Sequence, residues 1–185
     1  MTDEYLHKMT EVGEKRGKIL RKDAHQKGIC HSTVHIWVIT AQGDILLQKR
    51  AKQKKQFADC YHMAIAGHVS YPDTSVETVK KESMEELGLE IDTSKLIHLF
   101  SFHEALVVPE TGETDNEYRD IYVYIVDSKD QLGSLELQES EVQGLEWVTL
   151  KDFAEGIENE TLYKQMLPHA KSYYLRVVEE LQRYI

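Results

Sequence analysis

Cysteines, prolines and long apolar runs are scarce in this chain, and each scarcity narrows the class of protein. The 185 residues include two cysteines and three prolines. Cys30 and Cys60 form no dense disulfide framework and have no metal-ligand spacing, so we expect idle thiols in a reducing compartment. The longest apolar run, residues 121–126, is far shorter than a bilayer span, and the charged first residues lack the apolar segment of a signal peptide. We therefore expect a cytoplasmic protein that does not enter a membrane.

The chain also lacks an excess of basic residues. It has 22 Lys and Arg against 32 Asp and Glu, a formal net charge of -10. This balance argues against a protein that holds a nucleic-acid polymer through a basic surface. If the substrate is a small anion, a bound divalent cation is the obvious means of holding it. The composition, 41% hydrophobic and 29% charged, is globular, and the length suits one domain with a short appendage.

Hydrophobic periodicity predicts strands on both sides of an internal helix. Residues 31–40 are β-branched and aromatic, with Val34, Ile36 and Val38 on one face. A turn then leads into a second strand at residues 45–48, which predicts a hairpin. A third strand is expected to end near Ala66. Three further strands are expected at residues 96–107, 118–126 and 145–148. Because strands and helices do not alternate strictly, the pattern favours the α+β class, with a mixed β-sheet that has helices on its faces.

The two ends of the chain differ from its middle. Residues 1–27 form a polar N-terminal lead-in with a possible small hairpin that turns at Gly17. Residues 28–165 are expected to form the main domain, and residues 166–185 an extra C-terminal helix. Four apolar residues of this tail share one helical stripe: Tyr174, Val177, Val178 and Leu181. The stripe is expected to pack on its own domain or on a partner, for example in a homodimer.

The best helix in the first half runs from about Thr74 to Leu87. Thr74 is followed three residues later by Glu77, which is a capping-box pattern, and Gly88 ends the helix at a position that favours glycine. The side expected to pack on the sheet carries Val76, Val79, Ser83 and Leu87.

The other side of this helix carries three glutamates, Glu82, Glu85 and Glu86, at i, i+3 and i+4. Carboxylates this close repel one another unless a cation lies between them, and oxygen ligands on a rigid element suit Mg²⁺ or Mn²⁺. Taken alone, the pattern is more often a solvated acidic helix face.

Residues before and after the glutamates extend the pattern. The segment from Gly67 to Leu89 resembles the Nudix box, Gly-x5-Glu-x7-Arg-Glu-U-x-Glu-Glu-x-Gly-U with U aliphatic, and its spacing holds throughout, including Gly88. Three positions depart from the box: Asp73 replaces Glu, Lys81 replaces Arg and Ser83 replaces the aliphatic residue. In the family the first two positions pair, so a shorter carboxylate facing an ammonium group loses bidentate geometry. Ser83 weakens packing under the helix.

The resemblance implies a Nudix fold, a mixed sheet between helices, and hydrolysis of a diphosphate linked to another group. It implies Mg²⁺ (or Mn²⁺) as the cofactor, with Glu82 and Glu86 as first ligands and Glu85 joining them for an additional ion. Such ions neutralise the bridging and leaving oxygens while a carboxylate orients or deprotonates the attacking water. Glu82 is a candidate to orient that water, and Glu117 and Glu104 are candidate general bases.

Beyond the box, the chain is similar to the Nudix branch that includes type I isopentenyl diphosphate isomerase. The similar residues are Ala24-His25, His31, residues 46–51, Lys54, Lys55, Gly67-His68 and Asn116-Glu117. In the isomerase, histidines and downstream acids form a separate metal site, which implies a possible second metal site here. Its residues would be His25, His31 and His68, with Asp115 and Glu117 as the acids. The alternative is that the histidines are ordinary hydrogen-bonded strand and loop residues. Ala66 stands where the isomerase has a catalytic cysteine, which favours a hydrolase.

Three basic residues after the predicted hairpin, Arg50, Lys54 and Lys55, suit a diphosphate substrate; the alternative is a solubilising loop. Five aromatic residues could stack on a base but are more often core: Trp37, Tyr61, Phe102, Tyr118 and Tyr122. We predict Mg²⁺-dependent hydrolysis of a nucleoside diphosphate, or of a nucleoside diphosphate linked to another group. The alternatives are isopentenyl diphosphate isomerase activity and a catalytically weak Nudix-fold ligand sensor.

Overall fold

The computed structural model describes residues 3–185 as a nine-stranded mixed sheet with helices on both faces. The strands are β1 (Tyr5–Met9), β2 (Lys15–Leu20), β3 (His31–Thr40), β4 (Asp44–Arg50), β5 (Tyr61–Met63), β6 (Ile65–His68), β7 (Leu96–Val107), β8 (Thr114–Val126) and β9 (Val142–Thr149). The α-helices are α1 (Arg21–Lys27), α2 (Ser75–Leu87), α3 (Leu150–Glu158) and α4 (Lys171–Leu181). The predicted strands and the two predicted helices are confirmed, whereas α1 and α3 are not among the predicted elements.

Strand β3 is the centre of the sheet, and every one of its residues is buried. It pairs in parallel with β8 along its whole length, from His31 opposite Glu117 to Thr40 opposite Val126. It pairs antiparallel with β1, β4 and β6. β4 also pairs with β5 and β9, and β7 forms a long hairpin with β8. One parallel pairing among antiparallel ones makes the sheet mixed, as predicted.

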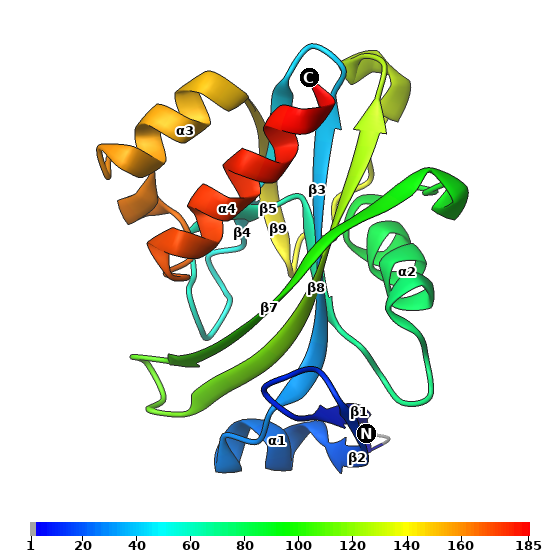
Figure 1. The fold of residues 1–185 in the computed structure, drawn as a ribbon, viewed down its shortest axis with the longest axis vertical. Coiled ribbons are helices and arrows are strands. Elements are labelled where there is room, and N and C mark those ends of the chain that lie inside the picture. Colours follow the sequence, from blue (N-terminus) through cyan, green and yellow to red (C-terminus); the bar gives the residue numbers. More distant parts are fainter. Residues whose placement is uncertain (1–2) are drawn as a thin grey trace.

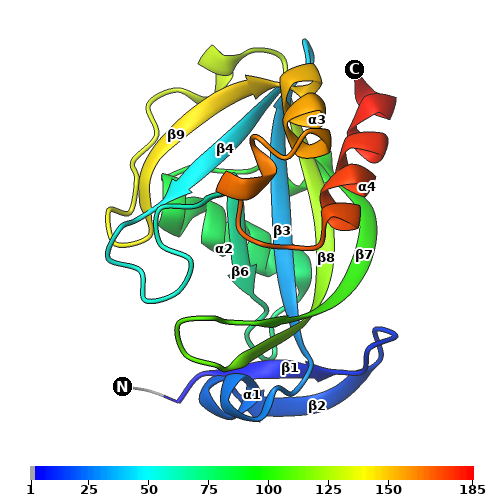
Figure 2. The same ribbon diagram turned by 90° about the vertical axis from the view of Figure 1, so that its left-hand side faces the viewer.

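The helices cover the two faces of this sheet, with α2 on one side and α3 and α4 on the other (Figures 1 and 2). Because successive side chains of a strand point to opposite faces of the sheet, β3 contributes residues to two separate hydrophobic cores. Val34, Ile36 and Val38 pack with the core of helix α2, while Trp37 and Ile39 pack with the cores of α3 and α4. The α+β class and the sheet between helices are thereby confirmed.

Helix α4 packs on its own chain. Its buried residues are Tyr173, Tyr174, Val177, Val178 and Leu181, and they belong to the same core as Trp37 and Phe153. The apolar stripe was expected to pack either on its own domain or on a partner, and in the structure it packs on its own domain. The stripe is therefore not available to a partner, and a homodimer would use another surface.

The lead-in forms the β1–β2 hairpin followed by α1, at the lower end of the molecule in Figure 1. The hairpin turn lies at Thr10–Glu14, where the Gly13 amide donates to the Thr10 carbonyl, so the predicted turn at Gly17 is wrong. Gly17 instead lies within β2 at a register shift, with a φ of +91° that favours glycine. β1 joins the sheet beside His31. Within residues 3–185, no helix is long and apolar enough to cross a bilayer.

Candidate functional site

Helix α2 is fixed at both ends, which fixes the directions of its side chains. The Thr74 hydroxyl accepts a hydrogen bond from the Glu77 amide, and the Glu77 carboxylate accepts one from the Thr74 amide, so the predicted capping box is present. Gly88 ends the helix in the left-handed conformation. Val79, Ser83 and Leu87 are buried as predicted. Val76 is exposed, so its predicted place against the sheet is wrong.

Ser83 adapts to the interior through a hydrogen bond. It is fully buried, and its hydroxyl donates to the Val79 carbonyl at 2.6 Å. The hydroxyl group therefore has a partner within the helix, although it fills less volume than the aliphatic residue of the box.

Gly67 leaves the space that Glu82 occupies. A Cβ atom at Gly67 would lie 2.2 Å from Glu82 Cδ, far inside van der Waals contact. The strand that carries Gly67, β6, packs against α2, and the register of β6 on β3 places Gly67 opposite Val34, on the face that α2 covers. Only glycine lets the Glu82 carboxylate lie against the backbone at this point.

The Asp73 and Lys81 side chains form the ion pair expected from the family, with Lys81 Nζ 2.5 Å from Asp73 Oδ2. The Lys81 side chain is 59% exposed, so the pair contributes little to stability. The Asp73 carbonyl also contacts His7 Nε2 at 2.8 Å. Asp73 therefore joins the start of α2 to β1.

A cavity of about 1020 Å³ opens in front of α2 and collects most of the predicted site residues. Those that line it are His25, Arg50, Lys54, Lys55, Gly67, His68, Asp73, Lys81, Glu82, Glu85, Glu86, Asp115 and Glu117. Gly88, Glu104 and His31 are not among its lining residues. The five strand aromatics named above do not line it either, and Phe57 is the aromatic residue other than histidine that does.

Two glutamates of α2, Glu82 and Glu86, lie where burial disfavours the charged form of a carboxylate. Glu86 is buried, and its Oε2 atom has no hydrogen-bond partner within the described chain. Burial and the neighbouring charge of Glu82 hold the pKa of Glu86 well above its ordinary value. Burial, together with the charge of Glu85, raises the pKa of Glu82 to about 7. Such carboxylates fit a hard divalent cation such as Mg²⁺ or Mn²⁺, which would supply the missing positive charge.

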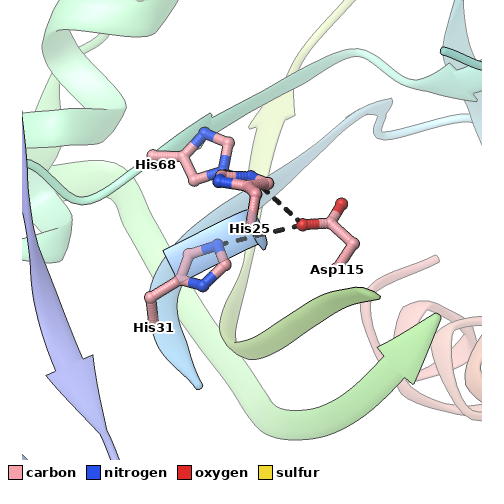
Figure 3. Close-up of side chains that lie close together, drawn as sticks. All are labelled: His25, His31, His68 and Asp115. Carbon is pink, nitrogen blue, oxygen red and sulfur yellow. Dashed lines mark hydrogen bonds and ion pairs between the residues drawn. The ribbon is translucent and has the colours of Figure 1, made fainter. Parts of the chain in front are cut away.

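A second group of ligand-type residues converges at the lower end of β3 (Figure 3). His25 comes from α1, His31 from β3, His68 from β6 and Asp115 from β8. Each of the four offers a ligand atom, and these atoms all lie within 4.8 Å of one another. His25 Nε2 lies 3.2 Å from His68 Nε2 and 3.3 Å from Asp115 Oδ1. The convergence that the sequence left open is therefore present.

Hydrogen bonds on the far side of two of these rings direct their other nitrogens into the group. His25 Nδ1 lies 2.8 Å from the Arg21 carbonyl, and His31 Nδ1 lies 2.9 Å from the Ile29 carbonyl. A nitrogen that faces a carbonyl carries the proton, so Nε2 of a neutral ring presents a lone pair. His31 Nε2 and Asp115 Oδ1 are buried without a hydrogen-bond partner within residues 3–185. Lone pairs that face one another fit a bound cation.

Glu117 lies between this group and a buried arginine. Its Oε1 atom is 3.7 Å from His68 Nε2 and 3.9 Å from His31 Nε2, while its Oε2 atom accepts from Arg119 at 2.8 Å. Burial works to raise the pKa of Glu117, but the charge of Arg119, the neighbouring histidines and the hydrogen bond from Arg119 together lower it. Glu117 is therefore ionised at neutral pH, with one oxygen directed to the histidines.

Glu104 is unsuited to act as a general base. Its Oε2 atom contacts Arg119 at 2.7 Å and His169 at 2.8 Å, and its Oε1 atom accepts from the Ala170 amide at 2.6 Å. Burial works to raise its pKa, but hydrogen bonding to His169 and the Arg119 charge lower it to about 2. With both oxygens occupied and no surface on the cavity, Glu104 is a structural residue.

The three predicted basic residues reach the cavity with different degrees of freedom. Arg50 donates from Nε to the Phe57 carbonyl at 3.0 Å and from a terminal nitrogen to the Gln56 carbonyl at 3.2 Å. Lys54 forms an ion pair with Glu141. Lys55 is exposed, and no ion pair to it is found among the described residues.

Several further residues of the cavity were not predicted. They are Glu4, Arg21, His35, His62, Glu141 and His169. Of these, His35 had a sequence signal, because it follows His31 by four residues and so shares its face of β3. The others come from a loop, a short strand and the two ends of the chain, and nothing in their local sequence indicates that they meet.

Comparison with known proteins identifies the family. A model of the NUDIX domain matches residues 30–170. Over 162 residues the chain is 30% identical to an uncharacterized Nudix hydrolase of Clostridium acetobutylicum, an alignment that covers 86% of this chain and 76% of that protein. It is 28% identical to Nudix hydrolase 3 of Arabidopsis thaliana, covering 86% of this chain and only 21% of that longer protein. The chain therefore belongs to the Nudix family.

Two further comparisons show a likeness in sequence and a likeness in fold. It is 26% identical to isopentenyl-diphosphate Delta-isomerase of Citrobacter koseri over 80% of this chain and 81% of the isomerase. Its fold is similar to the crystal structure of DR0079 from Deinococcus radiodurans, with a TM-score of 0.63, 22% identity, and coverage of 87% of this chain and 98% of that one. The predicted Nudix-type enzyme and the likeness to the isomerase-containing branch are confirmed.

Proposed function

We propose that this Nudix enzyme hydrolyses the diphosphate bond of a nucleoside diphosphate, or of a nucleoside diphosphate linked to another group, with Mg²⁺ or Mn²⁺. The observation that supports it best is the cavity, where Glu82, Glu85 and Glu86 lie with Arg50 and the lysines of the following loop. Acidic ligands for a cation and basic groups for phosphate oxygens in one cavity are what diphosphate hydrolysis requires.

In this proposal Glu82, Glu85 and Glu86 would hold the cation, which would neutralise the oxygens of the diphosphate. The close approach of Glu82 to Gly67 fixes one carboxylate before the ion binds. Glu117 is the remaining candidate base, because it is ionised and one oxygen is free of Arg119.

Arg50, Lys54 and Lys55 would contact the phosphates. Arg50 is held by the Gln56 and Phe57 carbonyls, so it would act as a positioned donor rather than a mobile one. Lys54 would exchange Glu141 for a phosphate oxygen, and Lys55 would approach from solvent.

The group formed by His25, His31, His68 and Asp115 supports a second metal site beside Glu117, as the resemblance to the isomerases implies. This observation favours the alternative of isopentenyl diphosphate isomerase activity. Ala66 opposes that alternative, because a methyl group offers no proton in the place of the isomerase cysteine. We therefore rank it second. The free thiols of Cys30 and Cys60 support the cytoplasmic location that we propose.

The test is to measure release of phosphate and nucleoside monophosphate from nucleoside diphosphates, nucleoside diphosphate sugars, dinucleotide cofactors and isopentenyl diphosphate. Each reaction is run with Mg²⁺, with Mn²⁺, with chelator, and with chelator followed by excess Mg²⁺. We expect release from one nucleotide class that chelator abolishes and added Mg²⁺ restores. Rearrangement of isopentenyl diphosphate without any hydrolysis would support the isomerase instead. Tight binding of a nucleotide with no product in any condition would support a ligand sensor.

A further inference from the structure

A third group of ligand-type residues lies in the same cavity and plays no part in the function proposed above. It consists of His35 from β3, His62 from β5 and His169 from the segment before α4, and all three line the cavity. Their exposed fractions are 3%, 4% and 3%. One ring nitrogen from each lies within 4.8 Å of the others. Three imidazoles from three separate elements thus converge deep inside the molecule.

Two of the rings are held from behind, as the rings of metal-binding histidines commonly are. His169 Nδ1 lies 2.8 Å from Glu104 Oε2, and His35 Nδ1 lies 2.7 Å from the Tyr173 hydroxyl. Glu104 is ionised and can only accept, so His169 Nδ1 carries the proton and its Nε2 presents a lone pair. The hydrogen bond that Glu104 Oε1 accepts from the Ala170 amide helps to fix the carboxylate that orients this ring.

Polar atoms of the group lack partners. His169 Nε2 and His62 Nδ1 are buried and make no hydrogen bond within residues 3–185. Leaving a buried polar atom unsatisfied costs about 1–3 kcal/mol. Two such atoms in one group, both from rings that line a cavity, indicate a ligand at this point.

The surrounding charge permits a cation here. Two arginines are close to the group. Arg119 forms ion pairs with both Glu104 and Glu117, at 2.7 and 2.8 Å, so its charge is more than matched. Arg50, whose charge acts on His62, donates to the Phe57 and Gln56 carbonyls. Burial also keeps the imidazoles neutral: the pKa of His35 and that of His62 lie well below the ordinary value, mainly because of burial. Neutral imidazole is the form that coordinates metal ions.

We propose that His35, His62 and His169 form a three-histidine site for a divalent transition-metal ion such as Zn²⁺, with an open coordination position that faces the cavity. Three imidazoles suit Zn²⁺ and its transition-metal neighbours rather than Mg²⁺. Three protein ligands leave a fourth position for water or for an oxygen of a bound ligand. The three ring nitrogens lie within 4.8 Å of one another, and two nitrogens on one Zn²⁺ lie no more than about 4.2 Å apart, twice the Zn–N distance.

This site differs in chemistry from the other two groups. The glutamates of α2 offer only oxygen ligands, and the group around His25 includes Asp115, whereas this one offers nitrogen alone. The proposal does not depend on hydrolysis of a nucleotide. It predicts metal binding in the full chain whatever the substrate is.

The test uses Co²⁺ as the probe, because Co²⁺ bound by imidazoles in a site of low coordination number absorbs visible light far more strongly than Co²⁺ among carboxylates and water. The 185-residue chain is stripped with chelator, dialysed and titrated with Co²⁺, and bound metal is counted by elemental analysis. The host variant is His68→Gln, which removes one of the four ligand-type residues of the group around His25. We expect His68→Gln to retain one strongly absorbing Co²⁺.

Adding His62→Gln or His169→Gln to that host should remove the absorbing ion. Even the loss of a hydrogen-bond partner behind a ligand weakens metal binding about 10–100-fold, so the loss of a ligand should weaken it at least tenfold. His98→Gln, which changes an exposed histidine outside the group, should leave the absorbing ion in place. Thermal unfolding of each variant shows whether it is folded.

X-ray absorption spectroscopy of the His68→Gln host loaded with one equivalent of Zn²⁺ identifies the ligands of the ion without a further substitution. We expect three imidazole ligands. The proposal is overturned if this host binds no strongly absorbing Co²⁺, or if the added His62→Gln and His169→Gln changes leave it unaffected. If the unaltered chain binds one absorbing ion that His68→Gln removes, the group around His25 is the metal site and this one holds only water.

Discussion

Helix α2 and the histidine groups both supply ligand-type residues to one cavity, but they are assembled in opposite ways. The three glutamates lie within five consecutive positions of one capped helix, so local spacing alone puts them together. The histidines come from α1, β3, β5, β6 and the segment before α4, so strand pairing and the packing of α1 and of that segment are both needed to bring them together. The acidic site is therefore a property of a short segment, whereas the histidine sites are properties of the whole fold.

Helix α2 and the histidine groups also differ in how their side chains can be buried without a bound cation. A buried carboxylate such as Glu86 is charged in water and has to take up a proton or a cation when it is buried. A buried histidine such as His35 simply becomes neutral. The acidic site therefore has to bind a proton or a cation in the folded chain, while the histidine groups can remain folded without either.

The largest effect is expected from the buried ion pairs that connect the two histidine groups. Arg119 is fully buried between Glu117, beside the first group, and Glu104, behind His169 of the second. Arg119→Leu would leave two carboxylates buried without a countercharge, and we expect the free energy of unfolding to fall by about 3–5 kcal/mol. Urea unfolding in the absence of metal measures this change.

The matched control is Arg16→Leu, which removes an exposed pair with Glu14 and should cost no more than about 1 kcal/mol. If the two substitutions cost the same, the histidine side of the cavity would not depend on Arg119, and the contrast with the self-contained helix would fail.

Glu86→Gln separates the two roles of a buried metal ligand. Loss of a ligand to the cation should remove several kcal/mol of transition-state stabilisation, which corresponds to about a hundredfold or more in turnover. The metal-free protein should become more stable at neutral pH by about 1–3 kcal/mol, because an unsatisfied buried carboxylate is removed. Glu90→Gln, an exposed neighbour outside the helix, should change neither quantity.

The raised pKa of Glu86 determines how the effect of Glu86→Gln on stability changes with pH. The folded-state pKa of Glu86 is raised above the ordinary 4.5, so the folded state binds the proton more tightly. Stability from this group is therefore present below pH 4.5 and is lost as pH rises through the folded-state value. The advantage of Glu86→Gln should grow from acid to neutral pH. A variant that is less stable at pH 7 than the unaltered chain would contradict the account.

The same contrast explains what could be predicted from the sequence. The segment from Thr74 to Gly88 could be predicted with its cap, its end and its acidic side, because each depends on spacing within a few residues. The prediction that Val76 packs on the sheet was wrong. The spacing of apolar residues shows which side of the helix they share, but not whether the sheet extends as far as the first turn. The prediction of a turn at Gly17 also failed, because a glycine suited to a turn serves a bulge instead.

Prediction was weaker wherever distant segments meet. The group around His25 could be suggested only through the resemblance to the isomerases. His62 and His169 could not be found, because their meeting depends on how β5 pairs with β4 and on where the chain passes before α4. Helix α1 has only seven residues, of which Ala24 is buried, so its periodicity carried no signal.

Gly67→Ala tests whether the position of Glu82 on helix α2 depends on the neighbouring strand β6. The new methyl group would lie 2.2 Å from Glu82 Cδ, so the carboxylate or the strand has to move. Misplacement of a catalytic group by about 1 Å can cost about a hundredfold in rate, and we expect a ten- to hundredfold fall in turnover. Gly144→Ala is the control, because no atom lies within 4 Å of a Cβ at that position. Equal activity of the two variants would show that Glu82 needs no fixed position.

The smallest effect is expected from Lys81→Arg, which restores the residue of the Nudix box. Arginine could contact Asp73 through two nitrogens where lysine uses one, but the lysine side chain is 59% exposed. Exposed ion pairs contribute about 0–1 kcal/mol, so the equilibrium constant for unfolding and the turnover rate should each change by less than about fivefold. Lys81→Met should have an equally small effect. A much larger gain from Lys81→Arg alone would show that bidentate pairing shapes the loop before α2, and that even the most local part of the site depends on contacts outside the helix.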